Sequence, residues 1–242
     1  MTVLTVIPAR LGSARIPAKP LADICGEPLI ARVYKNAVKM RRAGRVVVAA
    51  DSEEVAAAAA AAGAETVMTP ETLASGSDRV LYALRKLSST AGVVVNLQGD
   101  EPLMDTVFVD RLVEAALGDE PADVFTASFR ADPERAQSSS AVKAVLDRKG
   151  YALYFSRSPV PYGASRYLIH QGVYVWRRKS LERFHSLEPT EAEKSERLEQ
   201  LRALENGMRI RVFLSSSDSP GVDTPEDLER VRGIFEKEGR RV

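Results

Sequence analysis

Residues 5–30, TVIPARLGSARIPAKPLADICGEPLI, lead from an apolar β-branched run into a basic loop. The loop brings Arg10, Arg15 and Lys19 close together, with glycine and proline between them. In open parallel sheets, ligands bind at the carboxyl ends of the strands. Arginine, lysine and successive backbone N–H groups suit the charge of a polyphosphate. The stretch therefore predicts a core strand followed by a phosphate-binding loop.

Strand-like and helix-like patterns alternate through the first half of the chain. We expect strands at 2–9, 45–50, 65–68 and 92–97, and helices at 28–40, 51–63, 77–88 and 105–117. Serine at position 77 is expected to cap the third of these helices. This regular order predicts an α/β fold with a parallel sheet and helices on both faces.

The alternation of strands and helices ends at about residue 122. We expect strands at 123–129, 141–146, 151–156, 169–177 and 208–214, and helices at 191–207 and 223–239. Few helices separate the first four of these strands, which predicts an antiparallel insertion at about 123–178. The whole chain, 1–242, is interpreted as a single domain, and the insertion as a candidate oligomer face. In the last helix, Thr224 is the expected cap and Pro225 the first helical residue.

Composition narrows the class of protein. The chain has 242 residues, 45% of them hydrophobic, and a formal net charge of +1. That balance gives no bias toward nucleic acid. The single cysteine, Cys25, cannot form an internal disulfide, and no apolar run approaches the ~20 residues that a membrane helix needs. With no signal-like N-terminal pattern, we expect a cytoplasmic protein without membrane partners.

Two acidic residues follow predicted strands or precede a predicted helix. Asp100 lies in NLQGDEP (96–102), directly after an apolar run, and Asp223 lies in GVDTPEDL (221–228) before the helix cap. Each alone is equally typical of a turn or a capping residue. Magnesium is commonly held by one or two carboxylates together with phosphates. Together with the basic loop, the two residues predict a nucleotide–Mg²⁺ site, although the spacing matches neither a P-loop nor a dinucleotide fingerprint.

Five segments, taken in order, resemble one known family. They are IPARLGSARIPAKPLADICGEPLI (7–30), NLQGDEPL (96–103), ALYFSRSPVPY (152–162), LEQLRALENG (198–207) and GVDTPEDLERV (221–231). Together they resemble the CMP-Kdo synthetases, the 3-deoxy-manno-octulosonate cytidylyltransferases, over nearly the whole chain. The resemblance implies a Rossmann-like, GT-A-like nucleotidyltransferase sheet with a β-extension used for dimerisation. It also implies a homodimer that joins CTP to an acidic sugar and releases pyrophosphate.

The resemblance also implies residue roles. The implied catalytic residues are Lys19, Arg10, Asp100 and Asp223, the last two as ligands of Mg²⁺. The implied nucleotide-binding residues are Ala9, Arg10, Gly12, Ser13, Lys19, Ser75, Gly76, Arg79, Gln98 and Gly99. The implied acceptor-binding residues are Arg15, Gln98, Arg157, His170, Tyr174, Glu199 and Gln200. Attack on the α-phosphorus needs alignment and charge neutralisation more than covalent chemistry, so we expect direct displacement.

Several positions depart from the family pattern. Ala18 stands where the family has glycine, which restricts the backbone beside the phosphates. Leu73 replaces a histidine, and Ser77 replaces threonine in the SGT segment. On the acceptor side, Ile169 replaces a lysine and Gln171 is new.

The segment 163–168, GASRYL, is short for the family. These differences leave the acceptor open at the level of sequence. Kdo or a related 2-keto sugar acid is the first expectation, and a small phosphonate such as phosphonoformate is the alternative. A non-catalytic CTP-binding protein is the alternative from another functional class. His170 also lies in an apolar strand, where a histidine alone is typical of the core.

Overall fold

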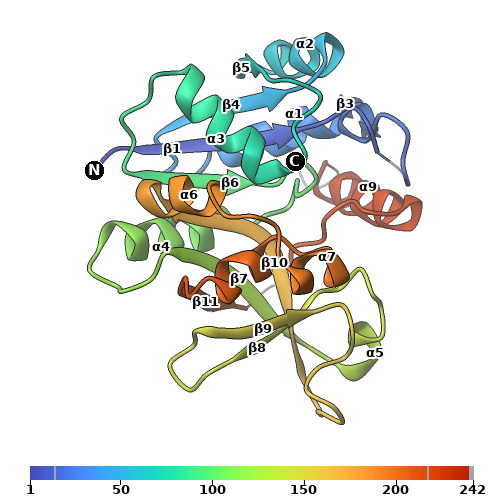
Figure 1. The fold of residues 1–242 in the computed structure, drawn as a ribbon. Coiled ribbons are helices and arrows are strands. Elements are labelled where there is room, and N and C mark those ends of the chain that lie inside the picture. Colours follow the sequence, from blue (N-terminus) through green and yellow to red (C-terminus); the bar gives the residue numbers. More distant parts are fainter. Residues whose placement is uncertain (14, 217, 240–242) are drawn as a thin grey trace. The chain divides into compact units, whose positions relative to one another are not determined.

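The computed structural model describes residues 1–13, 15–216 and 218–239 (Figure 1). The chain divides into two compact units. The terminal unit comprises residues 2–91 and 95–110 and the chain from Ser219 onward. The central unit comprises Met1, residues 92–94 and residues 111–218. In the part of the chain that the structure describes, no helix is both long enough and apolar enough to cross a bilayer.

Parallel strands form the sheet of the terminal unit. They are β1 (Val3–Ala9), β4 (Arg45–Ala50), β5 (Glu65–Met68) and the end of β6 (Val93–Leu97). Val6 pairs with Val47 between β1 and β4, and Ala49 pairs with Val67 between β4 and β5. Helices on both faces bury these strands, which explains why they read as continuous apolar runs.

Helices connect the strands of this unit. They are α1 (Leu29–Ala37), α2 (Glu53–Ala61) and α3 (Gly76–Lys86), with α9 (Pro225–Gly239) at the end of the chain, and α4 (Thr106–Leu117) is shared by both units. Right-handed crossovers from β1 to β4 and from β4 to β5 put α1 and α2 on one face of the sheet. The return from β5 toward β6 puts α3 on the other face, and α3 lies in front of the strands in Figure 1.

The connection from β1 to α1 is more structured than expected. It contains a short 3₁₀ helix, η1 (Lys19–Leu21), and a small hairpin of β2 (Asp23–Ile24) and β3 (Glu27–Pro28). The hairpin turn is Cys25–Gly26, and both residues have positive φ, as the common two-residue hairpin turns require. The sequence pattern did not predict these elements because each is only two or three residues long.

The central unit carries the antiparallel strands. They are β7 (Val124–Ala131), β8 (Lys143–Leu146), β9 (Ala152–Ser156) and β10 (Tyr167–Arg177), followed by β11 (Ile210–Ser215). β10 pairs antiparallel with β7 and β8, β8 pairs antiparallel with β9, and β11 runs parallel to β7. The short helices of this unit are α5 (Pro133–Ala136), α6 (Arg178–His185), α7 (Glu191–Glu196) and α8 (Gln200–Glu205). The predicted mixed α/β fold with antiparallel strands is confirmed.

Two expected helices differ from the structure. The single helix at 191–207 is wrong, because Arg197 adopts a left-handed conformation with φ of 54° and separates α7 from α8. The expected cap at Ser77 is also wrong. Ser75 has the extended backbone of a cap and accepts a hydrogen bond from the Asp78 N–H at 3.1 Å, whereas Ser77 lies inside the helix. Because serine stands at both positions, the sequence does not determine where α3 begins. The extended backbone at Ser75 identifies it as the cap.

The cap of α9 agrees with the sequence. Thr224 Oγ1 accepts from the Asp227 N–H at 3.2 Å, and Asp227 Oδ2 accepts from the Thr224 N–H at 2.9 Å. Asp227 Oδ2 also accepts from the Asp223 N–H at 3.2 Å. This reciprocal capping fixes the backbone of Asp223 at the start of the helix.

Candidate active site

A buried carboxylate anchors the start of the basic loop. Ala9 ends β1 in the core, and Arg10 is exposed. The Leu11 N–H donates to Asp51 Oδ1 at 2.8 Å. Sequence reasoning did not single out Asp51. It directly follows β4, as Asp100 follows β6, so the rule that places ligand-facing residues at the carboxyl ends of parallel strands could have found it.

The same carboxylate faces Arg79 of α3. Arg79 Nη2 lies 3.4 Å from Asp51 Oδ2, and the two side chains are 3% and 5% exposed. Arg79 Nη1 donates to Thr69 Oγ1 and to the Pro70 carbonyl oxygen. Burial lowers the pKa of Arg79, and the charge of Asp51 opposes that change. The guanidinium is thus turned inward and holds Asp51, which in turn holds the start of the basic loop through the Leu11 N–H. The predicted contact of Arg79 with nucleotide stays a prediction.

The middle of the loop is open. No atom lies within 4 Å of where a Cβ on Gly12 would be, and Gly12 is exposed. The Ser13 hydroxyl is placed to accept from the Ile16 N–H at 3.5 Å. Ala18 takes up the left-handed conformation that glycine favours, with φ of 46° and ψ of 42°, and it caps η1. Alanine there costs about 1–2 kcal/mol relative to a relaxed backbone.

Lys19 joins the loop to both predicted carboxylates. Its Nζ lies 2.5 Å from Asp100 Oδ2 and 3.4 Å from Asp223 Oδ1. It also donates to the Val222 carbonyl oxygen at 3.0 Å. Arg15 Nη2 lies 2.9 Å from Asp223 Oδ1. Four of the predicted residues therefore gather in one cluster of the terminal unit: Arg15, Lys19, Asp100 and Asp223.

Backbone contacts hold the two carboxylates near each other. The Val222 N–H donates to the Asp100 carbonyl oxygen at 2.8 Å, which ties the loop after β6 to the segment before α9. The Lys19, Asp100 and Asp223 side chains are 17%, 28% and 41% exposed, so the cluster opens progressively toward solvent. The described residues contain no group of three or more His, Cys, Asp or Glu side chains arranged to hold a metal.

The donor set nevertheless suits magnesium. Two carboxylates converge on a single cationic atom, Lys19 Nζ, so they already face one point that favours positive charge. Two carboxylate ligands with the remainder supplied by phosphate is the usual arrangement for Mg²⁺ in nucleotide sites. Asp100 and Asp223 therefore fit the predicted role.

Close backbone packing surrounds Gln98 and Gly99. A Cβ on Gly99 would lie 2.7 Å from the Pro8 carbonyl oxygen, so only glycine fits beside the end of β1. A Cβ on Gly76 would lie 3.8 Å from the Gln98 side-chain amide, which places Gln98 next to the start of α3. The Ser75 hydroxyl is occupied by its cap on α3. Glycine at 99 thus has a structural reason independent of any ligand.

A second cluster lies in the central unit, around His170 and Tyr174 of β10. Their rings are 5.2 Å apart, and the Phe155 ring meets His170 edge-on at 5.2 Å. Burial lowers the pKa of His170 to about 3, so its ring is neutral near pH 7. Burial, with a smaller contribution from the charge of Glu199, raises the pKa of Tyr174. Three predicted acceptor residues therefore interact here: His170, Tyr174 and Glu199.

Arg157 is bound mainly by backbone oxygens. Its Nε donates to the Glu196 carbonyl at 2.7 Å, Nη1 to Ser139 O at 3.0 Å, and Nη2 to Arg197 O at 3.3 Å. The left-handed backbone at Arg197 belongs to this arrangement. The guanidinium thus holds three chain segments together, and its predicted contact with an acceptor carboxylate stays a prediction.

A buried lysine supports the same segment. Lys143 of β8 has no exposed surface, and its Nζ donates to the carbonyl oxygens of Ser138 and Arg157. Burial lowers the pKa of Lys143, and the nearby charge of Glu196 opposes that change. Glu196 Oε2 also accepts from the Arg157 N–H at 2.8 Å. Lys143 and Glu196 thus hold the backbone of Arg157. Sequence reasoning missed both, and a lysine between apolar residues in AVKAVL was the available signal.

The predicted acceptor residues are divided between the two units. Arg15 and Gln98 lie in the terminal unit, and the other five lie in the central unit. Gln200 begins α8 and is 5% exposed, so its side chain is largely internal. Within the terminal unit, Arg15 pairs with Asp223.

Comparison with known proteins identifies the family. The sequence profile of the cytidylyltransferase family matches residues 4–210. A 3-deoxy-manno-octulosonate cytidylyltransferase from Chlorobium chlorochromatii is 45% identical over 98% of both chains. The enzyme of the same name from Chlorobium limicola is 46% identical over 100% of both chains. The chain belongs to the 3-deoxy-manno-octulosonate cytidylyltransferase family.

Solved structures agree with this assignment. A structure of CMP:2-keto-3-deoxy-manno-octonic acid synthetase complexed with CTP superposes with a TM-score of 0.92. The two sequences are 39% identical, and the match covers 98% of this chain and 100% of the chain in that structure. A cytidylyltransferase from Leptospira borgpetersenii, at 17% identity and a TM-score of 0.67, shares the fold. The family and the cytidylyltransferase activity predicted from the sequence are confirmed.

Two of the departures on the acceptor side of this cytidylyltransferase lie on one face of β10. Successive strand residues point to opposite faces, so Ile169 and Gln171 face away from His170. Both are buried, at 3% and 4% exposed, and Ile169 packs in a small core with Phe129 and Tyr167. Both substitutions therefore lie on the face of the strand opposite His170.

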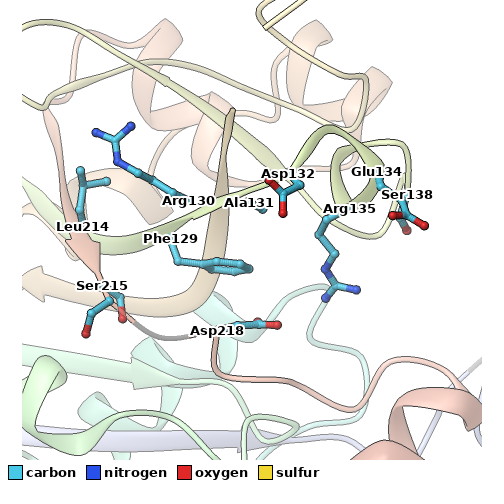
Figure 2. Close-up of a pocket in the computed structure, with 11 residues that line it drawn as sticks. Phe129, Arg130, Ala131, Asp132, Glu134, Arg135, Ser138, Leu214, Ser215 and Asp218 are labelled. Atoms are coloured by element: carbon cyan, nitrogen blue, oxygen red, sulfur yellow. The ribbon is translucent and has the colours of Figure 1, made fainter. Parts of the chain in front are cut away.

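A separate pocket lies in the central unit, beside the end of β11. Its volume is about 760 Å³, and it contains none of the predicted site residues. Figure 2 shows the Phe129 ring between Leu214 and Arg135, with Asp218 below the ring in this view. The lining mixes both signs of charge, and Asp132 is paired with Arg166 at 2.8 Å. The pocket thus presents no uniform charge to a ligand.

Proposed function

We propose that this cytidylyltransferase transfers CMP from CTP to 3-deoxy-manno-octulosonate (Kdo), releasing pyrophosphate. The observation that carries the proposal is the convergence of Lys19, Asp100 and Asp223 at one point. Full-length relatives named for Kdo, at 43–46% identity, support this acceptor. A homodimer, a cytoplasmic location and a place in lipopolysaccharide biosynthesis remain parts of the proposal.

The reaction is a displacement at the α-phosphorus of CTP. An acceptor hydroxyl oxygen forms a bond to that phosphorus, the bond to the β-phosphate oxygen breaks, and the hydroxyl proton is lost. The work of the protein is to align the reactants and to balance the charge on the phosphates. No protein nucleophile is needed for this step.

The basic loop supplies positive charge for the phosphates. Lys19 and Arg10 stabilise the departing pyrophosphate, because donors fixed before the reaction favour the charge that develops on it. Asp51 and Arg79 keep the start of the loop in place through the Leu11 N–H. The open backbone at Gly12 leaves room for a close approach of the phosphates.

Asp100 and Asp223 would hold Mg²⁺, which when bound supplies charge neutralisation at the phosphates. In its absence, the two carboxylates are balanced by Lys19 and Arg15. With Mg²⁺ held by the two carboxylates, Lys19 and Arg15 would be available to bind phosphate.

The His170 cluster would bind the acceptor. A neutral histidine and a protonated tyrosine form hydrogen bonds to sugar hydroxyls without adding net charge. The alternative of a phosphonate acceptor is not favoured, because full-length relatives at 43–46% identity are named for Kdo. A non-catalytic CTP-binding protein is not favoured either, since the Lys19 cluster is intact.

The test is pyrophosphate release from CTP and Mg²⁺ with Kdo or phosphonoformate offered separately. We expect pyrophosphate release in the reaction that contains Kdo and none in the reaction that contains phosphonoformate. Asp100→Asn should lower the rate by at least about a hundredfold, because charge stabilisation of this kind contributes several kcal/mol. Asp132→Asn, in an exposed ion pair of the central unit, is the matched control and should retain the native rate. Release with phosphonoformate alone, or with neither compound, would contradict the proposal.

A further inference from the structure

The hydrogen bonds of Thr126 determine which ring nitrogen of His170 carries a proton. Thr126 lies on β7, opposite Tyr174, and is fully buried. Its Oγ1 lies 2.6 Å from the Val173 carbonyl oxygen and 2.8 Å from His170 Nε2. Both contacts have good hydrogen-bond lengths.

Counting protons leaves one arrangement that satisfies both contacts. A carbonyl oxygen only accepts, so the single Thr126 hydroxyl proton is donated to Val173 O. Thr126 Oγ1 can then only accept from His170, which requires a proton on Nε2. In a neutral imidazole, the other nitrogen, Nδ1, is then an acceptor.

A bulge in β10 aims Val173 O at Thr126. His170 pairs with Ser128 and Gln171 with Ala127, but Tyr174 pairs with Thr126, so residues 172–173 have no partner in the ladder. Bulges of this kind redirect backbone and side-chain groups and are enriched next to functional sites. The Thr126 bond to Val173 O closes the bulge and fixes the hydroxyl at the same time.

The remaining nitrogen is available. Among the described residues, no hydrogen bond is made to His170 Nδ1, and the side chain is only part-buried. The Phe155 and Tyr174 rings restrict rotation of the imidazole. Protonation does not disturb this state near pH 7, because burial lowers the pKa of His170 to about 3.

We infer that Thr126 is a positioning residue that holds His170 in the Nε2–H tautomer, so that Nδ1 accepts a hydrogen bond from a hydroxyl group of the sugar-acid acceptor. The acceptor part of this inference rests on the proposed function. The tautomer part rests only on the contacts of Thr126. Together they make the site selective for an acceptor that donates a hydroxyl proton, since a bare anion has none to offer.

Nitrogen-15 NMR of histidine-labelled protein tests the tautomer directly. The chain has two histidines, His170 and His185, so His185→Gln assigns the spectrum. We expect the His170 ring to show a protonated Nε2 and a bare Nδ1, distinguished by their couplings to the ring protons. Added Kdo should shift the Nδ1 resonance in the direction that accepting a hydrogen bond causes. A native spectrum with the proton on Nδ1 would overturn the inference.

Thr126→Val and Thr126→Ser form a matched pair of variants. Valine keeps the shape and removes the hydroxyl, so the His170 tautomers should become mixed and the KM for Kdo should rise roughly tenfold, with the KM for CTP unchanged. Serine keeps the hydroxyl and should preserve both the spectrum and the KM. A valine variant with native tautomer and native KM would refute the role of Thr126.

The two proposals fail in different ways. A native enzyme that releases no pyrophosphate with Kdo would contradict the proposed function, while the NMR spectrum would still decide the tautomer. An active enzyme whose Nδ1 resonance does not move with Kdo would refute the acceptor contact. If Thr126→Val does not fold, the native spectrum and Thr126→Ser still decide the inference.

Discussion

Lys19 Nζ lies 2.5 Å from Asp100 Oδ2, so the ammonium group of the basic loop pairs with a carboxylate that would hold Mg²⁺ under the proposed function. Asp223 lies 3.4 Å from the same nitrogen. Under the proposed function, Lys19 and Mg²⁺ would compete for the same two carboxylates in the protein without nucleotide. Such competition would be measurable as a change in thermal stability with Mg²⁺, without enzyme turnover.

Lys19→Met should increase the stabilisation of the nucleotide-free protein by Mg²⁺. Without the ammonium group, Asp100 and Asp223 repel each other, and a bound cation relieves that repulsion. Thermal unfolding with and without MgCl₂ should show a larger rise in Tm for this variant than for the native protein. Lys39→Met, at an exposed position, is the control and should behave as native. Equal shifts in all three proteins would contradict the competition.

Ala18→Gly should stabilise the protein. Ala18 has a φ of 46°, in the left-handed region where a side chain is strained. Relief of about 1–2 kcal/mol exceeds the extra chain entropy of about 0.4–1 kcal/mol that glycine brings to the unfolded state. Urea unfolding measures the difference. Ala57→Gly, at an exposed position of α2, is the control and should destabilise by about 1 kcal/mol. A loss of stability at position 18 would contradict the strain.

Much of this architecture could be predicted from the sequence, since the β-branched runs of β1, β4 and β6 and the cap at Thr224 are strong local signals. The break between α7 and α8 could not be, because it depends on the bonds between Arg157 and the carbonyls of 196 and 197. Asp100 and Asp223 were identified from their places next to a strand and a helix cap. Lys143 and Thr126 were missed, since their functions depend on contacts between distant strands.

Gly99→Ala should destabilise the protein by about 1–3 kcal/mol, the cost of forced overpacking. A Cβ there would lie 2.7 Å from the Pro8 carbonyl oxygen, and neither backbone segment can yield easily, because both continue into strands. Gly233→Ala in α9 is the matched control. Beyond the backbone of its own helix, nothing lies within 4 Å of its would-be Cβ, so alanine should stabilise the helix by roughly 0.5–1 kcal/mol. Chemical denaturation measures the free energy of unfolding of both variants. Changes of the same sign at the two positions would contradict the prediction.

Glu193→Ala should cost about 3–5 kcal/mol, since it leaves a buried charge without its partner. Arg202 donates through Nε and Nη2 to both oxygens of Glu193, at 2.8 and 2.5 Å, and both side chains are about one-tenth exposed. Asp132→Ala breaks the exposed pair with Arg166 and should cost less than about 1 kcal/mol. Urea unfolding of the two variants compares them. Similar losses would show that burial does not govern the strength of these pairs.

His170 should make the stability of the native protein depend on pH below about 6.5. Burial lowers the folded-state pKa of His170 from 6.5 to about 3, so between these values the unfolded chain binds a proton that the folded protein does not. Stability is therefore fully present above pH 6.5 and falls by up to about 1.4 kcal/mol per pH unit as the pH drops toward 3. The two rings packed against His170 stay neutral over this range, because Phe155 does not ionise and burial raises the pKa of Tyr174.

The measurement is the free energy of unfolding of the native protein and of His170→Gln at several pH values between 4 and 8. Glutamine does not titrate, so other carboxylates contribute equally to both proteins and cancel in the difference. The native protein should lose stability relative to the variant as the pH falls below 6.5. His185→Gln controls for the loss of a histidine elsewhere, and its curve should stay parallel to the native curve. A parallel curve for His170→Gln would mean that the His170 ring accepts a proton in the folded protein as readily as in the unfolded chain.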